Sequence, residues 1–500
     1  MRKTTTLLLA FILSFGCLSA CGSQKMDISD VDIPEFAETD GVKFLAYSGP
    51  TVENWSGGSG NVSTFTDEHF QKFVDAGFTG LLAVHEGAPT YSSRYDPFEE
   101  IRRRNKDAEE DAVAALALCE KFDLKYYVRD WPFYDFYSYS DASKYDAAAL
   151  IDTREEYEQA IRETFKEDNP YIYSSAYAGN FGRDEPGIDQ FEMLKWQIEI
   201  YQEVMAERGI EDAEFFLNLL PAYGSDLAYG GERGEPTSYA NYVDKYFEEL
   251  APLLGYVSYD YYPFLRDAKK GSLLRSTYLS NLELMARKCK ENNCELRTFV
   301  QTGADFTGLR DITSIADFRL QVYANLAFGA KVMTYYEYGT FNSQDEGEFG
   351  LINLQDGTYN YTYDLAKKVN NEVHAFEDAY LNYEYDGVMC FSALPAGQIN
   401  SNFRSIAQKM ESHPRIGKVT ITQDAIISAF KDAEGNDAFM LLNYNDPYFN
   451  LDNRVTVQFK DAKGLLMYRF GEEYVVPLNK DGTYTFELYP GEGRFIIPLK

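Results

Sequence analysis

The stretch Gly179-Asn180-Phe181-Gly182-Arg183-Asp184-Glu185-Pro186 decides the fold of this chain. It has the pattern of a β-strand that runs into two adjacent carboxylates and a proline. The proline has no N–H to give to a strand ladder, so we expect the strand to end there. Asp184 and Glu185 then lie at the carboxyl end of the strand. In a parallel α/β barrel, functional side chains gather at this end.

Strand-type and helix-type segments alternate from residue 41 to residue 383, which predicts parallel strands joined by right-handed crossovers. Eight such units favour a (β/α)8 TIM barrel. A doubly wound sheet is the alternative, but no helix starts directly after the glycine-rich loop at 57–60, as a dinucleotide site requires. We expect the strands over 43–47, 80–84, 124–128, 176–182, 214–220, 256–260, 296–301 and 331–337.

The helical periodicity stops near residue 384. Short β-type runs follow, and turn signals such as Glu434-Gly435-Asn436 separate them. This pattern predicts an antiparallel β-sandwich domain over residues 384–500.

The N-terminus has the pattern of a targeting segment. Met1-Arg2-Lys3 is basic, residues 7–15 are apolar, and Leu18-Ser19-Ala20-Cys21-Gly22 resembles the lipobox of bacterial lipoproteins. We therefore expect a signal peptide over residues 1–20, a lipid on Cys21 and a flexible polar tether over residues 21–40. The protein is then anchored on the extracytoplasmic face of a cell membrane. An ordinary secretory signal with a chance cysteine is the alternative.

The composition narrows the class of ligand. A net charge of −32 opposes binding to nucleic acid. Aromatic residues make up 16% of the chain, more than a core alone requires, and suggest a site for a neutral, ring-shaped ligand such as a sugar. The four histidines are scattered and no C-x-x-C pair occurs, so we expect neither a metal site nor a cofactor.

Polar and aromatic residues recur at the expected strand ends, where a barrel brings them to one pocket. Several carboxylates in such a pocket suit cleavage of a glycosidic bond. That reaction needs one carboxylic acid to protonate the leaving oxygen and a second carboxylate on the other side of the sugar. Repulsion and burial raise the pKa of one of them. We expect Glu185 to be the acid, and we expect substrate contacts from Asp184, Glu86, Arg129, Asp130, Trp131, Asn218, Tyr262 and Gln301.

Asp184-Glu185-Pro186 resembles the Asn-Glu-Pro motif of clan A glycoside hydrolases, in which the glutamate is the acid/base. Asn218-Leu219-Leu220-Pro221 and Asp260-Tyr261-Tyr262-Pro263 follow in the order found in family-42-like and lipoprotein members of that clan. The resemblance covers residues 40–380. It implies a TIM barrel, a carbohydrate substrate and an acid/base role for Glu185.

One feature departs from the clan A pattern. The seventh expected strand ends in Thr298-Phe299-Val300-Gln301-Thr302, without the nucleophilic glutamate of that clan. Three interpretations follow. Another strand supplies the second carboxylate, with Glu337 as first choice and Asp260 as second. Alternatively, a 2-acetamido group of the substrate acts as nucleophile and the pair of Asp184 and Glu185 is sufficient to orient it. In the third interpretation hydrolysis has been lost, and the protein is a non-catalytic carbohydrate-binding surface lipoprotein.

Overall fold

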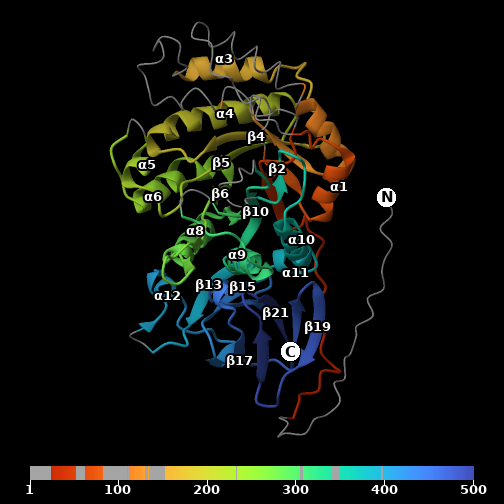
Figure 1. Cartoon of the computed structure of the whole chain (residues 1–500), viewed down its shortest axis with the longest axis vertical. Coiled ribbons are helices and arrows are strands. Elements are labelled where there is room, and N and C mark those ends of the chain that lie inside the picture. The colour runs from red at the N-terminus through yellow and green to blue at the C-terminus, as the bar shows by residue number, and fades with distance from the viewer. Residues whose placement is uncertain are drawn as a thin grey trace.

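The computed structural model describes residues 24–51, 62–82, 110, 112–129, 133, 153–231, 234–304, 308–340, 350–395 and 398–500. A ring of parallel strands with helices around it forms one part of the molecule, and antiparallel sheets form the other (Figure 1). Helices α9, α10 and α11 lie where the two parts meet.

The parallel strands form one eight-stranded sheet in the order β5-β4-β3-β2-β1-β10-β9-β6. A parallel bridge between Leu219 and Tyr259 joins the two edge strands, and the Leu219 N–H donates to the carbonyl of Ser258 at 2.9 Å. This contact closes the ring, so the predicted TIM barrel is confirmed. The strands are β1 (Lys43–Tyr47), β2 (Gly80–Leu82), β3 (Lys125–Val128), β4 (Tyr177–Asp184), β5 (Glu214–Asn218), β6 (Tyr256–Tyr259), β9 (Glu295–Gln301) and β10 (Ala330–Tyr336).

Helices alternate with these strands and carry the capping signals of their sequences. Thr153 and Glu156 form a capping box at α3, and the Thr66 side chain accepts from His69 N–H at α1. The longer helices are α1 (Asp67–Asp75), residues 112–122, α3 (Arg154–Thr164), α4 (Phe191–Glu207), α6 (Tyr239–Glu249), α8 (Tyr278–Asn292), α9 (Ile315–Ala327) and α10 (Tyr361–His374). The shorter ones are α5 (Asp226–Gly230), α7 (Ala251–Leu254), α11 (Glu377–Leu381), α12 (Ser401–Ser405), η2 (Ile188–Gln190) and η4 (Pro447–Phe449).

Apolar side chains fill the barrel interior, so a functional site has room only at the ends of the strands. Alternate residues of each strand point inward, as the pleat requires. The buried inward side chains are Leu45, Tyr47, Leu82, Tyr127, Ala178, Phe181, Phe216, Phe299 and Val332. Two short pairs, β7 (Phe264–Leu265) with β8 (Leu273–Leu274) and β11 (Gly339–Thr340) with β12 (Ile352–Asn353), lie in the connections that follow β6 and β10.

The C-terminal part forms two antiparallel sheets, as predicted. The larger sheet has the order β13-β15-β16-β21-β18-β19 and the smaller has the order β14-β17-β20. A separate apolar core lies between them. The strands are β13 (Glu384–Phe391), β14 (Ile416–Ile421), β15 (Ala425–Lys431), β16 (Asp437–Asn443), β17 (Asn453–Phe459), β18 (Gly464–Arg469), β19 (Glu472–Pro477), β20 (Thr483–Leu488) and β21 (Gly493–Leu499).

The flexible tether predicted for residues 21–40 is wrong where the structure describes it. Residues 24–40 lie along the folded chain, and the Met26 N–H donates to the carbonyl of Leu478 at 2.8 Å. Met26, Val31 and Phe36 pack against the apolar cores. The prediction relied on the mostly polar composition of this segment, in which these few apolar residues did not stand out. The predicted signal peptide and Cys21 lie outside the described residues. Among the described helices, none has the length and apolarity needed to cross a bilayer.

Candidate active site

Glu185 stands immediately after β4 in an unusual backbone conformation. Its φ of 47° lies in the left-handed region, which costs free energy for a residue other than glycine. The Glu185 N–H donates to the carbonyl of Asn218 at 2.9 Å, and this bond across β4 and β5 holds the turn. The turn leaves the Glu185 side chain exposed, whereas most of β4 is buried.

Asp184 is fixed by two donors, one from the adjacent strand β5 and one from β1. Its Oδ1 accepts from Asn218 Nδ2 at 3.1 Å, and its Oδ2 accepts from the Tyr47 hydroxyl at 3.1 Å. Burial raises the pKa of the Asp184 carboxyl. The two donors and the charges of Arg129 and Arg183 oppose that rise.

Asn218 connects the tips of β4 and β6. Its Oδ1 accepts from the Ser258 hydroxyl at 3.0 Å, so its Nδ2 faces the carboxylates. From there Nδ2 donates to Asp184 and, at 3.3 Å, to Asp260 Oδ1. The predicted strand-end residues of β4, β5 and β6 are therefore brought together.

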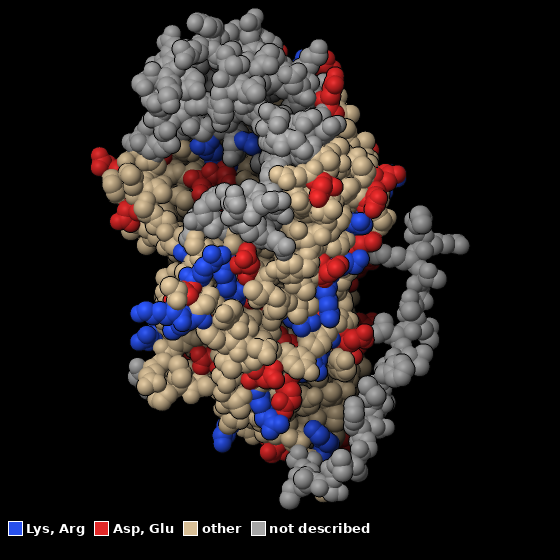
Figure 2. Space-filling view, viewed as in Figure 1, with Lys and Arg blue, Asp and Glu red and all other residues tan. Residues whose placement is uncertain are grey.

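Glu185 and Asp260 form a hydrogen-bonded pair of carboxyls. Partial burial and then the charge of Asp184 raise the pKa of Glu185 to about 7, while the hydrogen bond from Asp260 acts in the opposite direction. Burial and the charges of Glu185 and Asp184 raise the pKa of Asp260 well above its ordinary value. The two side chains therefore share a proton, with Asp260 as donor, and titrate together. Figure 2 shows acidic atoms on the floor of a hollow in the surface over this end of the barrel.

Glu337 lies on the far side of the barrel mouth. It follows β10, which is four positions from β4 in the ring of eight strands. Its Oε2 accepts from the Ser48 hydroxyl at 2.9 Å, and its carbonyl accepts from the Thr302 hydroxyl at 2.9 Å. Burial raises the pKa of Glu337 to about 7, and neither Glu185 nor Asp260 contributes to that shift. Glu337 is thus separate from the proton-sharing pair.

The remaining predicted contacts divide into three groups. Tyr262 packs its ring 5.4 Å from that of Tyr336 at the top of the barrel core. Gln301 has both ends of its amide occupied: Oε1 accepts from Phe264 N–H at 3.2 Å, and Nε2 donates to the carbonyls of Gly303 and Arg310. The Gln301 amide is therefore bonded to backbone groups of the connecting loops. The last group, Glu86, Asp130 and Trp131, lies outside the described residues.

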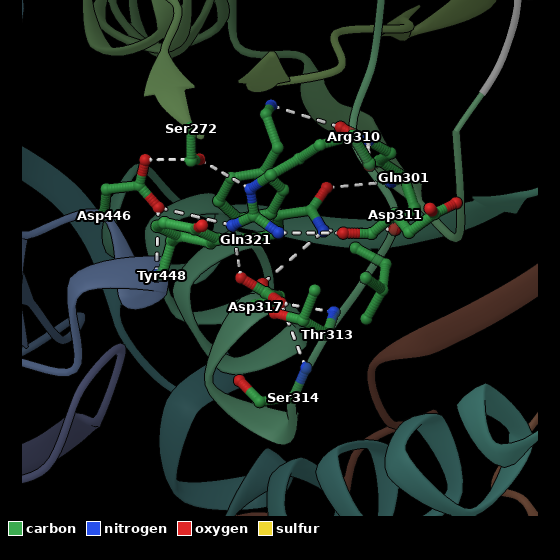
Figure 3. Close-up of polar contacts among 12 residues, drawn as sticks. Ser272, Gln301, Arg310, Asp311, Thr313, Ser314, Asp317, Gln321, Asp446 and Tyr448 are labelled. Atoms are coloured by element: carbon green, nitrogen blue, oxygen red, sulfur yellow. Dashed lines mark hydrogen bonds and ion pairs between the residues drawn. The ribbon is translucent and has the colours of Figure 1, made fainter. Parts of the chain in front are cut away.

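A buried polar network ties this rim to the β domain (Figure 3). Arg310, in the connection after β9, forms ion pairs with Asp317 at 2.6 Å and with Asp446 of the β domain at 3.3 Å. Ser272 donates to Asp446 at 2.7 Å and accepts from Arg310 Nε at 2.6 Å. Since the Arg310 carbonyl binds Gln301, the end of β9 is connected to the β domain through these groups.

Three residues of the site were not found from the sequence. Tyr47 is the last residue of β1 and Ser48 follows it. The expectation that functional residues lie at the carboxyl ends of strands, which located Asp184, would also have found them. Tyr223 lies in the connection after β5, and its pKa is raised by burial and by the charge of Asp260. No pattern in the sequence marks Tyr223, because its place depends on how that loop folds.

Among the residues that the structure describes, no group of three His, Cys, Asp or Glu side chains is placed to hold a metal ion.

No protein family model matches the chain, and no curated protein does. Solved structures of glycoside hydrolases with TIM-barrel-like folds are similar to it. A GH27 β-L-arabinopyranosidase from Geobacillus stearothermophilus is 11% identical, with 92% of this chain and 96% of that chain covered and a TM-score of 0.46. The endo-β-1,4-mannanase from Thermotoga petrophila is 9% identical, with 90% and 97% covered and a TM-score of 0.41. We draw no functional argument from similarity at this level.

Proposed function

We propose that this protein is a glycoside hydrolase in which Glu185 is the general acid. One observation carries the proposal: a partly exposed carboxyl with a pKa of about 7 lies at the carboxyl end of a barrel strand, beside two further carboxyls. An acid with a pKa near the working pH is well suited to donate a proton to a leaving oxygen. The strand ends of a TIM barrel are also where catalytic groups are found.

The neighbours of Glu185 have distinct roles in this proposal. Two donors favour the charged form of Asp184, and that charge raises the pKa of Glu185. Asp260 shares a proton with Glu185 and so orients its carboxyl. Once Glu185 has protonated the glycosidic oxygen, its carboxylate is placed to take a proton from the incoming water.

We propose Glu337 as the second carboxylate. Asp260 touches Glu185, so it cannot act on the opposite side of a sugar ring from the acid. Glu337 follows β10, which lies opposite β4 in the ring of strands, and a second carboxylate across the sugar from Glu185 must come from that side. Burial raises the pKa of Glu337 to about 7. Because the buried carboxylate is poorly solvated, it is a reactive nucleophile or base when it is ionised.

The anchoring of the protein on the extracytoplasmic face of a membrane through a lipid on Cys21 is also a proposal. The lipobox-like sequence supports it. Metabolic labelling with a fatty acid should mark the wild-type protein and not the variant Cys21→Ser. Labelling of both would contradict the proposal.

A hydrolysis screen with purified protein tests the main proposal. Wild-type protein is expected to release the aglycone from at least one of a panel of aryl glycosides. On glycosides whose leaving group must be protonated, Glu185→Gln should lower kcat/KM about 10²–10⁴-fold. Glu434→Gln, in an exposed turn of the β domain, is the matched control and should leave the rate unchanged. Full activity of Glu185→Gln on such glycosides would overturn the assignment. Binding of glycans without turnover by the wild-type protein would favour the non-catalytic alternative.

A further inference from the structure

Arg275, in the connection between β8 and α8, is held in one orientation beside the acidic cluster. Its guanidinium carbon lies 3.7 Å from the centre of the Tyr223 ring, in a cation–π stack. Its Nε donates to the carbonyl of Tyr262 at 2.9 Å, and its N–H donates to the carbonyl of Pro263 at 2.9 Å. The side chain is only partly exposed. Its position is therefore fixed before any ligand arrives.

The residues that hold Arg275 are neighbours of Asp260. Tyr261 and Tyr262 follow Asp260 directly in the chain, and the rings of Tyr223 and Tyr261 pack edge to face at 5.1 Å. The Tyr223 hydroxyl is hydrogen-bonded to the backbone of Tyr262. Tyr223, on which the Arg275 guanidinium stacks, is close enough to Asp260 and Glu185 for their charges to raise the pKa of its hydroxyl.

The terminal amino groups of Arg275 lack an acceptor in the part of the chain that the structure describes. Arg275 forms no ion pair there, and Nε is its only side-chain donor with a bond. Four buried arginines, by contrast, each form an ion pair: Arg297 with Glu214 at 2.6 Å, Arg310 with Asp317 at 2.6 Å, Arg319 with Glu372 at 2.5 Å and Arg494 with Glu492 at 2.9 Å. An oriented guanidinium with two vacant amino groups matches a carboxylate or sulfate.

We propose that Arg275, stacked on Tyr223, forms the subsite for an anionic group on the substrate, so that the glycan cleaved is an acidic one. The inference rests on the proposed hydrolase function and names its substrate class: a sugar that carries a carboxylate, as in a uronic acid, or a sulfate. It departs from the neutral sugar that the aromatic content suggested. The net charge of −32 disfavours the approach of an anionic glycan, and a cation in the site offsets part of that repulsion.

Paired substrates test this inference. We would compare aryl glucuronide with glucoside, galacturonide with galactoside, and a sulfated aryl N-acetylglucosaminide with its unsulfated form. In at least one pair, wild-type kcat/KM should favour the anionic member about 10- to 100-fold, the size expected of hydrogen bonds to a charged group. The uronide and sulfate arms distinguish the two chemistries. Arg275→Gln should cost the anionic member about 10- to 100-fold more than the neutral one, and Arg275→Lys should restore part of the loss.

Arg454→Gln, at an exposed position on β17, is the control for removal of one arginine and should change neither rate. Thermal melting shows whether each variant is folded. Equal losses on both members of a pair, or a wild-type preference for neutral sugars, would overturn the inference. If wild-type protein cleaves no glycoside, the proposed function fails and calorimetry decides the inference. A uronate trisaccharide that binds wild-type protein and not Arg275→Gln then upholds the subsite, and no binding to wild-type overturns it.

Discussion

At the scale of single residues, the site depends on three neighbouring carboxyls whose negative charges repel one another. Asp184 accepts hydrogen bonds from Asn218 and Tyr47, which favour its charged form, whereas the pKa of Asp260 lies well above its ordinary value. Glu185 is left between them with a pKa of about 7. The same desolvation and charge repulsion that disfavour its ionised form make it an acid at neutral pH.

The pH dependence of activity should follow the protonation of Glu185. The acid must be protonated, so kcat/KM should fall as the pH rises through about 7, the pKa of Glu185. The charge of Asp184 raises that pKa, and Asp184→Asn should therefore move the alkaline limb to lower pH. Asp168→Asn, an exposed change, should leave the profile in place. An alkaline limb that stays, or moves upward, in Asp184→Asn would contradict the proposed coupling.

The sequence predicted which strand ends meet in the site, but it did not predict the role of each side chain there. Asp184, Asn218 and Asp260 were found because each ends or follows a strand. The sharing of a proton between Glu185 and Asp260 depends on distances of a few ångströms, which no spacing along the chain encodes. A position at a strand end does not by itself mark a residue that contacts substrate. Gln301 also ends a strand, but its amide donates to the carbonyls of Gly303 and Arg310 in the following loop.

At the scale of the element, β4 needs its glycines to place Asp184 and Glu185. Gly179 has a φ of 133°, and a Cβ there would lie 1.9 Å from the Glu214 carbonyl oxygen. A Cβ on Gly182 would lie 2.1 Å from the Phe215 ring. Both contacts are with β5. The close approach of the two strands is what permits Glu185 N–H to reach Asn218.

Gly179→Ala should therefore separate β4 from β5 and lower the melting temperature strongly. Gly209→Ala is the matched control, because Gly209 also has positive φ, 75°, but has no atom within 4 Å of the added carbon. We expect Gly209→Ala to cost about 1–2 kcal/mol, the price of the backbone conformation alone. Equal effects of the two changes, measured by thermal melting, would refute the steric argument.

Element boundaries were predicted less well than element order. The strand expected over residues 176–182 runs from Tyr177 to Asp184, because Asp184 still pairs with Asn218 in the ladder. The strand expected over 214–220 ends at Asn218, before the bridge at Leu219 that closes the barrel. In both cases pairing with a distant strand decided the end, and local composition does not report such pairing.

At the scale of the whole molecule, the two parts share one hydrophobic core. The rings of Phe376 and Tyr380, near the end of the barrel, pack against Phe495 at 6.1 Å and 5.7 Å, and Tyr380 also packs against Phe430. The ion pairs of Arg310 with Asp317 and Asp446 cross the same junction (Figure 3). The sequence indicated a change from helices to strands near residue 384, but not that the two sides share a core.

The barrel segment, residues 41–383, is therefore expected not to fold by itself. Without the β domain it exposes the rings of Phe376 and Tyr380 and leaves Arg310 without Asp446. Expressed alone, it should aggregate or bind a hydrophobic dye, whereas the full chain melts cooperatively. A monodisperse truncated barrel with a cooperative melting transition would show that the two parts are independent.

The role of Glu185 as a general acid is tested most directly by changing the leaving group. A dinitrophenolate departs without protonation, while the alkoxide of a sugar does not. We would measure kcat/KM, which reports the steps up to bond cleavage, for two substrates that share one sugar and differ in this group. We predict that Glu185→Gln costs the disaccharide about 10²–10⁴-fold and costs the dinitrophenyl glycoside far less. Equal losses on both substrates would contradict the assignment.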